Sequence, residues 1–156
     1  MKQITIEYTE FSALTDLVSE EQNLINEAKL AMEKAYAPYS NFQVGCSIEL
    51  VDGTIIHGAN QENSSYPAGL CAERVALFHA GAVYPGVSIK RIAISTKKEI
   101  NGRPIVPCGS CRQVLVESLS RQKEPIEVLM YSGKSVLKFN NAADLMPLSF
   151  SSKDLA

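Results

Sequence analysis

The chain has 156 residues, of which 46% are hydrophobic and 21% charged, and its formal net charge is −2 with a pI near 5.7. This length and composition predict one globular domain with a hydrophobic core of ordinary size. The slightly acidic balance argues against a surface that binds nucleic acid, and the absence of an apolar run of about 18 residues argues against a membrane-spanning helix.

The amino-terminal segment, residues 1–18, is expected to form an arm. Apolar and polar residues alternate over 4–8, which suits either a short strand or an arm alone. A capping-box pattern at 19–22 then predicts the start of a helix. Helical spacing of apolar residues continues over 24–35, and Pro38 stops the helix.

Strict alternation predicts a half-buried strand over 42–50, followed by a turn at 52–53 and a return strand over 54–57. The later elements are a helix over 69–80 closed by Gly81, a strand over 89–95, a helix over 109–119, and strands over 126–131 and 136–139. Strand–helix–strand units favour parallel neighbours, whereas a hairpin is antiparallel. We therefore predict an α/β fold with three layers, α/β/α, around a five-stranded mixed sheet.

Two short segments carry the residue types of a metal site: C-A-E at 71–73 and P-C-G-S-C at 107–111. Each cysteine pattern lies where a predicted helix begins, and the positive potential there stabilises thiolates. Zinc with three protein ligands keeps a fourth position for water, as catalytic sites do. The sequence thus predicts one Zn²⁺ per chain, bound by Cys71, Cys108 and Cys111.

A closed four-cysteine zinc site is the alternative, with Cys46 as the fourth ligand. Cys46 is in phase with Val44 and Ile48, however, and is expected to be a small core residue. A disulfide is also disfavoured. Residues 1–10 lack the apolar stretch of a secretory signal, so a reducing, cytoplasmic location is expected.

Glu73 stands between a predicted ligand and Arg74. The helix dipole alone could favour an acid there, but a carboxyl group beside a catalytic zinc can also shuttle protons. Zinc with three thiolates is formally anionic and a poor Lewis acid. Arg74 is expected to offset this by donating to a ligand sulfur, although a surface salt bridge is an ordinary alternative for an arginine.

The chain resembles the small, homotetrameric, zinc-dependent cytidine deaminases of the cytidine/deoxycytidylate deaminase superfamily. The resemblance covers residues 20–156, which would then form a single deaminase domain, 19–156, after the arm. It rests on Y-S-N-F-Q-V-G at 39–45, N-Q-E-N at 60–63, C-A-E-R at 71–74, P-C-G-S-C-R-Q-V at 107–114, and L-M-P at 145–147 followed by Phe150.

This resemblance implies hydrolytic deamination of cytidine and 2′-deoxycytidine to uridine and 2′-deoxyuridine plus ammonia, as in pyrimidine salvage. Water activated by zinc would attack C4, with Glu73 as the proton shuttle. The partners implied are a nucleoside substrate and further copies of the chain in a tetramer, with no nucleic acid and no membrane.

The resemblance also implies roles for residues outside the cysteine segments. Phe42 would pack against the pyrimidine, and Asn60 and Glu62 would bind the ribose hydroxyls. Tyr66 and Phe150 would line the site or a subunit interface. Without the resemblance, Asn60 and Glu62 are ordinary loop residues, and the two aromatic residues are ordinary core or rim residues.

Three other functions compete with this interpretation. A nucleic-acid or tRNA deaminase would use the same zinc chemistry but should be more basic. A non-catalytic, zinc-stabilised interaction domain would have no need of Glu73. A deaminase of an antibiotic nucleoside, such as blasticidin S deaminase, is closest, but the N-Q-E-N segment argues against it.

Overall fold

The protein is described by a computed structural model that covers residues 1–97, 99 and 102–155. Within these residues the α-helices are α1 (Ser19–Met32), α2 (Ala72–Val83) and α3 (Gly109–Ser120). The strands are β1 (Thr9–Phe11), β2 (Val44–Leu50), β3 (Ile55–Ala59), β4 (Ile89–Thr96), β5 (Glu127–Tyr131) and β6 (Val136–Phe139). Short 3₁₀ helices are η1 (Leu14–Asp16), η2 (Tyr66–Ala68), η3 (Ala142–Leu145) and η4 (Ser152–Leu155).

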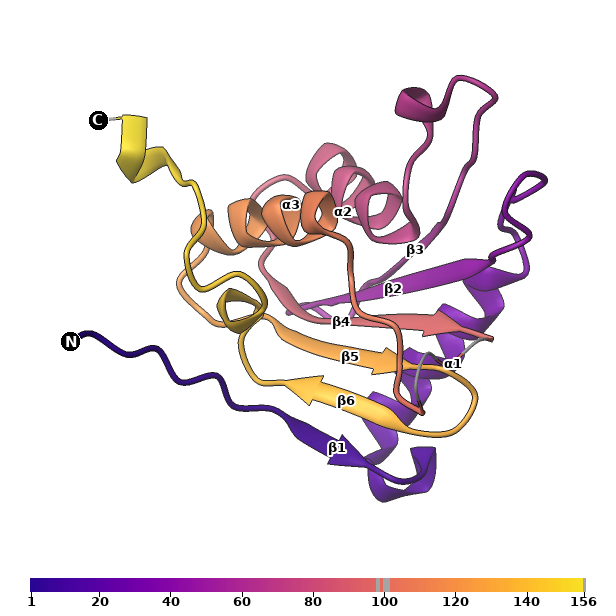
Figure 1. Ribbon diagram of the computed structural model, residues 1–156, viewed down its shortest axis with the longest axis horizontal. Coiled ribbons are helices and arrows are strands. Elements are labelled where there is room, and N and C mark those ends of the chain that lie inside the picture. The colour runs from indigo at the N-terminus through magenta and orange to yellow at the C-terminus, as the bar shows by residue number, and fades with distance from the viewer. Residues whose placement is uncertain (98, 100–101, 156) are drawn as a thin grey trace.

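The strands form one mixed sheet in the order β1-β6-β5-β4-β2-β3. Strands β4 and β5 are parallel and joined through α3, while the other neighbouring pairs are antiparallel. Helix α1 covers one face of the sheet, and α2 and α3 cover the other (Figure 1). The predicted three-layer α/β/α fold is confirmed, with six strands in the described residues where five were expected.

The additional strand, β1, comes from the segment expected to be an arm. It pairs antiparallel with β6, with Thr9 opposite Lys138 and Phe11 opposite Val136. Residues 4–8, where the alternation lies, precede β1 and are exposed. A three-residue strand is too short to show a period, so its pairing could not be read from the local pattern. The division into an arm and a domain stays a prediction.

The start of α1 differs from the expected capping box. Ser19 is the first helical residue, and the N-cap is Val18, whose side chain forms no capping hydrogen bond. The Ser19 hydroxyl instead donates to the Glu20 carboxylate at 3.0 Å. The capping-box assignment was therefore wrong, although the helix it predicted is present.

Helix α2 begins later and ends later than the sequence suggested. It starts at Ala72, so that Cys71 is its N-cap, and it continues through Gly81 to Val83. A glycine inside a helix costs only about 1 kcal/mol relative to alanine, which tertiary packing readily overrides. The later start matters because it places Cys71 at the N-terminus of the helix, as its N-cap, rather than inside the first turn.

Glycines bring helices close to both faces of the sheet. A Cβ atom at Gly45 would lie 2.0 Å from the carbonyl oxygen of Ala28 in α1. A Cβ atom at Gly58 would lie 2.4 Å from the carbonyl oxygen of Ala72 in α2. Gly58 therefore allows the first turn of α2, and with it Cys71, to rest directly on β3.

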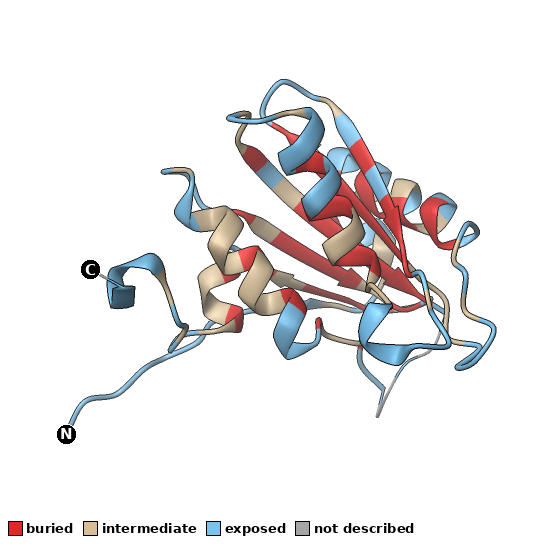
Figure 2. Cartoon of the chain, turned by 90° about the horizontal axis from the view of Figure 1, so that it is seen from above, coloured by how far each residue is buried: buried red, intermediate tan, exposed pale blue. Residues whose placement is uncertain are grey.

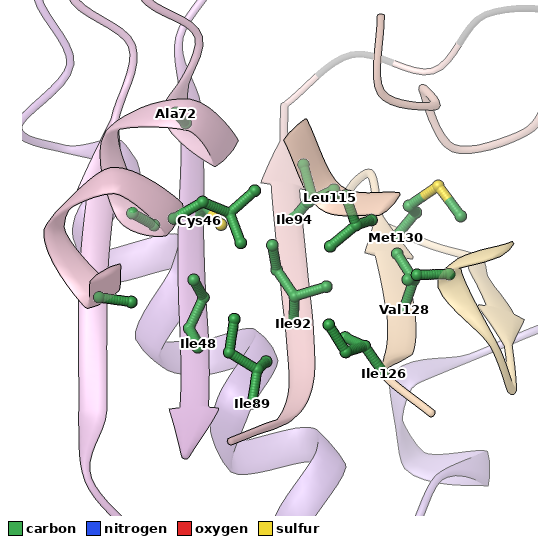
Figure 3. Close-up of a cluster of buried hydrophobic side chains, with 14 of the residues drawn as sticks. Cys46, Ile48, Ala72, Ile89, Ile92, Ile94, Leu115, Ile126, Val128 and Met130 are labelled. Atoms are coloured by element: carbon green, nitrogen blue, oxygen red, sulfur yellow. The ribbon is translucent and has the colours of Figure 1, made fainter. Parts of the chain in front are cut away.

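The core between the sheet and helices α2 and α3 is built from alternate residues of β2, β4 and β5 (Figure 3). Cys46 is fully buried in this cluster, as predicted, and burial raises the pKa of its thiol. The buried residues concentrate in the strands, while the outer faces of the helices are exposed (Figure 2). Among the described helices, none is long and apolar enough to span a membrane.

Candidate active site

Three thiols meet where α2 and α3 begin. Cys71 is the N-cap of α2, Cys108 is the N-cap of α3, and Cys111 lies in the first turn of α3. Their sulfur atoms all lie within 4.8 Å of one another. The Cys71–Cys108 distance is 3.9 Å and the Cys108–Cys111 distance is 3.4 Å. The structure thus brings together the three cysteines that the sequence predicted as ligands.

This cluster suits a zinc ion. Thiolate sulfurs at about 2.3 Å from a tetrahedral zinc lie about 3.8 Å from one another, close to the separations seen here. A hydrogen bond from the Cys111 thiol, assisted by Arg74 and Cys108, lowers the pKa of Cys71 to about 5. The same hydrogen bond raises the pKa of Cys111, its donor. Contacts within the cluster thus favour the thiolate form of Cys71, which is the form that binds metal.

Arg74 lies against this cluster. Its Nη2 atom is 3.4 Å from the Gly69 carbonyl oxygen and 3.9 Å from the Cys71 sulfur. Among the ion pairs found in the described residues, none includes Arg74. The geometry favours a guanidinium that faces the Cys71 sulfur over the alternative of a surface salt bridge.

Glu73 is the second residue of α2, and only 6% of its surface is exposed. Burial, with a smaller contribution from the nearby Cys71, raises the pKa of its carboxyl group. A carboxyl group with a raised pKa holds a proton more readily than an ordinary glutamate, which suits a group that accepts and releases protons. The dipole of α2 alone would favour the ionised form of an acid at this position. Burial acts in the opposite direction, so the dipole does not explain the raised pKa of Glu73.

A cavity of about 560 Å³ adjoins the thiol cluster. Of the residues singled out by sequence, its lining includes Phe42, Asn60, Glu62, Tyr66, Cys71, Glu73, Arg74 and Cys108. Cys111 is buried and does not line the cavity. Phe150 also lies outside it, with 60% of its surface exposed and its carbonyl oxygen bonded to the Gln113 side chain at 2.9 Å.

The sequence motifs missed part of the cavity wall. Leu70 and Ile94 line it, together with Thr96 at the carboxyl end of β4 and the 105–106 segment that precedes α3. The rule that sites form beyond the carboxyl ends of strands could have pointed to Thr96. The apolar residues carry no such signal, because Ile94 fits the pattern of any buried strand and the others lie in connecting segments.

Asn60 is buried and holds the start of β2. Its Oδ1 atom accepts from the Val44 backbone N–H at 2.8 Å, and its Nδ2 atom donates to the Phe42 carbonyl oxygen at 2.9 Å. These bonds bring the two motif segments at 39–45 and 60–63 together beside the cavity. Within the part of the chain that the structure describes, the second N–H of the Asn60 amide has no acceptor.

The Glu62 carboxylate is held by Tyr39 and Ser40, at the start of the 39–45 segment. Its Oε2 atom accepts from the backbone N–H groups of Tyr39, at 2.9 Å, and Ser40, at 3.2 Å. Its Oε1 atom accepts from the Ser40 hydroxyl. The Ser40 hydroxyl and these backbone groups lower the pKa of the Glu62 carboxyl group, which keeps it ionised.

Tyr66 lies in η2 at the edge of the cavity, and 76% of its surface is exposed. Its ring meets that of Tyr39 edge to face, with the centroids 6.2 Å apart. Both tyrosines therefore line the cavity while remaining open to solvent or to another molecule.

The fold and the cavity define a class: an α/β enzyme in which clustered thiols lie beside a buried carboxyl group. The chain belongs to the cytidine and deoxycytidylate deaminase family, because the model of that family's zinc-binding region matches residues 18–124. The predicted family is thereby confirmed.

Named relatives and solved structures agree with this family. The chain is 42% identical to cytidine deaminase of Sporosarcina psychrophila over 136 residues, covering 86% of this chain and 94% of the relative. It is 40% identical to that of Halalkalibacterium halodurans, covering 86% and 96%. The crystal structure of cytidine deaminase from Burkholderia pseudomallei superposes with a TM-score of 0.71 at 43% identity, covering 86% of this chain and 100% of that one.

Proposed function

We propose that the protein hydrolyses cytidine and 2′-deoxycytidine to uridine and 2′-deoxyuridine plus ammonia. The observation that carries this proposal is the buried Glu73, which shares one cavity with Cys71 and Cys108. The cytidine deaminases that match most of the chain support the choice of substrate. A resident Zn²⁺ held by Cys71, Cys108 and Cys111 would supply the Lewis acidity that activates a water molecule.

Glu73 is proposed to move the protons of this reaction. It accepts a proton from the water whose oxygen bonds to C4 of the pyrimidine, and it donates a proton to N3. It then delivers the second proton of that water to the exocyclic amine as the C4–N bond breaks and ammonia leaves. The raised pKa of this carboxyl group suits a residue that must both take and give protons.

Asn60 and Glu62 are proposed to bind one hydroxyl group of the sugar. Counting bonds among the described residues, the Asn60 amide has one N–H left after its bond to Phe42, and Glu62 Oε1 has one acceptor position left after its bond from Ser40. One donor and one acceptor match a single hydroxyl group. We assign it to the 3′-hydroxyl, which cytidine and 2′-deoxycytidine share, and we assign the ring of Phe42 to the pyrimidine.

The resemblance to the family also supports proposals about the oligomeric state, the cellular location and the metabolic role of the protein. We propose a homotetramer in which Tyr66 and Phe150, both well exposed in the single chain, lie at or near subunit boundaries. We further propose a role in pyrimidine salvage in the cytoplasm, with residues 1–18 as an arm on the deaminase domain 19–156.

An ultraviolet assay with cytidine, 2′-deoxycytidine and a cytosine-containing oligonucleotide tests this function. We expect rapid conversion of both nucleosides and little reaction at an internal cytosine, whose 3′ oxygen is a phosphodiester. Activity on the oligonucleotide alone would favour a nucleic-acid deaminase. Zinc binding without turnover of any substrate would favour a non-catalytic zinc domain.

A further inference from the structure

The hydroxyl group of Ser40 touches both of the segments that face the sugar and the base. It donates to Oε1 of Glu62, and it accepts from the backbone N–H of Phe42 at 3.0 Å. The backbone N–H of Ser40 adds a bond to Oε2 of Glu62 at 3.2 Å. A single serine therefore connects the carboxylate proposed to bind the sugar with the aromatic residue proposed to hold the pyrimidine.

The backbone between Ser40 and Phe42 adopts a conformation that needs support. Asn41 has a φ of 55°, in the left-handed region, and its N–H donates to the Ala37 carbonyl oxygen at 3.1 Å. Asparagine tolerates this region better than most residues do, but a side-chain bond that spans it helps to hold it. The bond between the Ser40 hydroxyl and the Phe42 N–H spans Asn41 in this way.

Phe42 is thus held from two sides by side chains. Ser40 accepts from its backbone N–H, and Asn60 donates to its backbone carbonyl oxygen at 2.9 Å. The Asn60 side chain is buried, whereas Ser40 is exposed. Loss of the Asn60 amide should therefore affect folding, while loss of the Ser40 hydroxyl should leave water to satisfy the freed groups and the fold intact.

We propose that Ser40 is a positioning residue that fixes the Glu62 carboxylate relative to Phe42, so that the sugar and the pyrimidine of a nucleoside are recognised together. This inference rests on the proposed function. Without the hydroxyl, Glu62 keeps its backbone bonds at Oε2, but Oε1, the atom with a free acceptor position, loses its anchor. Substrate binding should suffer while the proton chemistry at Glu73 is unchanged.

Steady-state kinetics with cytidine test this role in the full chain with its zinc content measured. Ser40→Ala should lower kcat/KM by about tenfold to a hundredfold, the range expected for a hydrogen bond to a charged group, mainly through KM. Ser40→Thr keeps the hydroxyl and should recover most of the loss. Ser64→Ala removes a hydroxyl from the neighbouring exposed loop and should behave like the parent protein. The midpoint of thermal unfolding should be the same for all four proteins.

A double-mutant cycle with Glu62→Ala separates an effect transmitted through Glu62 from an independent effect of the Ser40 hydroxyl. If Ser40 acts through Glu62, then Ser40→Ala should add little to the loss already caused by Glu62→Ala. Additive losses, a defect in kcat alone, or a Ser40→Ala variant as active as Ser64→Ala would each overturn the role of Ser40. A Glu62→Ala variant with normal KM would overturn the sugar site as well, and a parent protein inactive on cytidine would overturn the function on which both depend.

Discussion

The Nη2 atom of Arg74 lies 3.9 Å from the Cys71 sulfur, so a guanidinium faces one of the three thiols proposed to hold zinc. Three thiolates donate strongly to a metal and weaken it as a Lewis acid. A cationic donor beside one sulfur opposes that effect, as residues around metal ligands commonly do.

Arg74→Gln should therefore slow cytidine turnover by about tenfold to a hundredfold. Arg121→Gln is the matched control, because Arg121 is exposed and pairs only with Glu117 at 3.9 Å in the described residues. Zinc affinity, measured by competition with a chelator, should change in Arg74→Gln and not in Arg121→Gln.

Replacing Cys71 by histidine also removes a negative charge next to the metal, which tests whether charge is what Arg74 corrects. The double variant Arg74→Gln/Cys71→His should then lose less activity than the two single effects predict. Strict additivity at full zinc occupancy would make Arg74 a structural residue instead.

Loss of one thiol should remove the metal and lower stability. Cys108→Ala should contain no zinc and unfold at a lower temperature, because binding free energy contributes to folding free energy. Cys46→Ala is the control: its thiol lies in the core, so it should lose some stability and keep its zinc. If Cys46→Ala lost its zinc and Cys108→Ala kept it, the ligand set would have to include Cys46 instead.

Asn60→Ala and Glu62→Ala should differ in stability although both raise KM. Asn60→Ala removes the partner of two half-buried groups, the Val44 N–H and the Phe42 carbonyl, and an unsatisfied buried group costs up to about 1–3 kcal/mol. Glu62 is half-buried, but its partners Tyr39 and Ser40 are exposed and can bind water instead, so its loss should change the free energy of unfolding little. Urea unfolding of both variants, alongside kinetics with cytidine, measures the difference. Equal stabilities would mean that Asn60 does not hold the start of β2.

Gly58→Ala should disturb the start of α2. The added methyl group would lie 2.4 Å from the Ala72 carbonyl oxygen and 2.6 Å from the Ala76 nitrogen, both backbone atoms, so the helix must shift. We expect a loss of about 1–3 kcal/mol, as for other overpacked sites, with weaker zinc binding. Gly81→Ala, inside α2 with only Arg121 near the new methyl group, should be neutral or stabilising. A tolerated Gly58→Ala would show that α2 does not depend on this close approach.

Much of the site was predictable because its signals are local. A thiol at the start of a helix after a strand can be recognised from two short segments, and the structure does place Cys71 and Cys108 at helix N-caps. The alternating apolar residues that predicted β2, β4 and β5 also located Cys46 in the core.

The remaining features depend on pairings between distant parts of the chain. Strand β1 forms because it pairs with β6, which lies far away in the sequence. The bonds from Asn60 to the Phe42–Val44 segment join residues 16 and 18 positions apart, and nothing in the local pattern indicates them. Phe150 lies outside the cavity of the single chain, so its expected role stays a prediction about the assembly.

The measurement that tests the central claim most directly is cytidine turnover by Glu73→Gln at a zinc content equal to that of the parent protein. Glutamine keeps the size and polarity of the buried side chain but cannot carry protons between water, N3 and the leaving amine. General acid–base catalysis contributes about 10²–10⁴-fold, so we predict a loss of at least this order with zinc and fold retained. Turnover within a few-fold of the parent, at full zinc occupancy, would contradict the account.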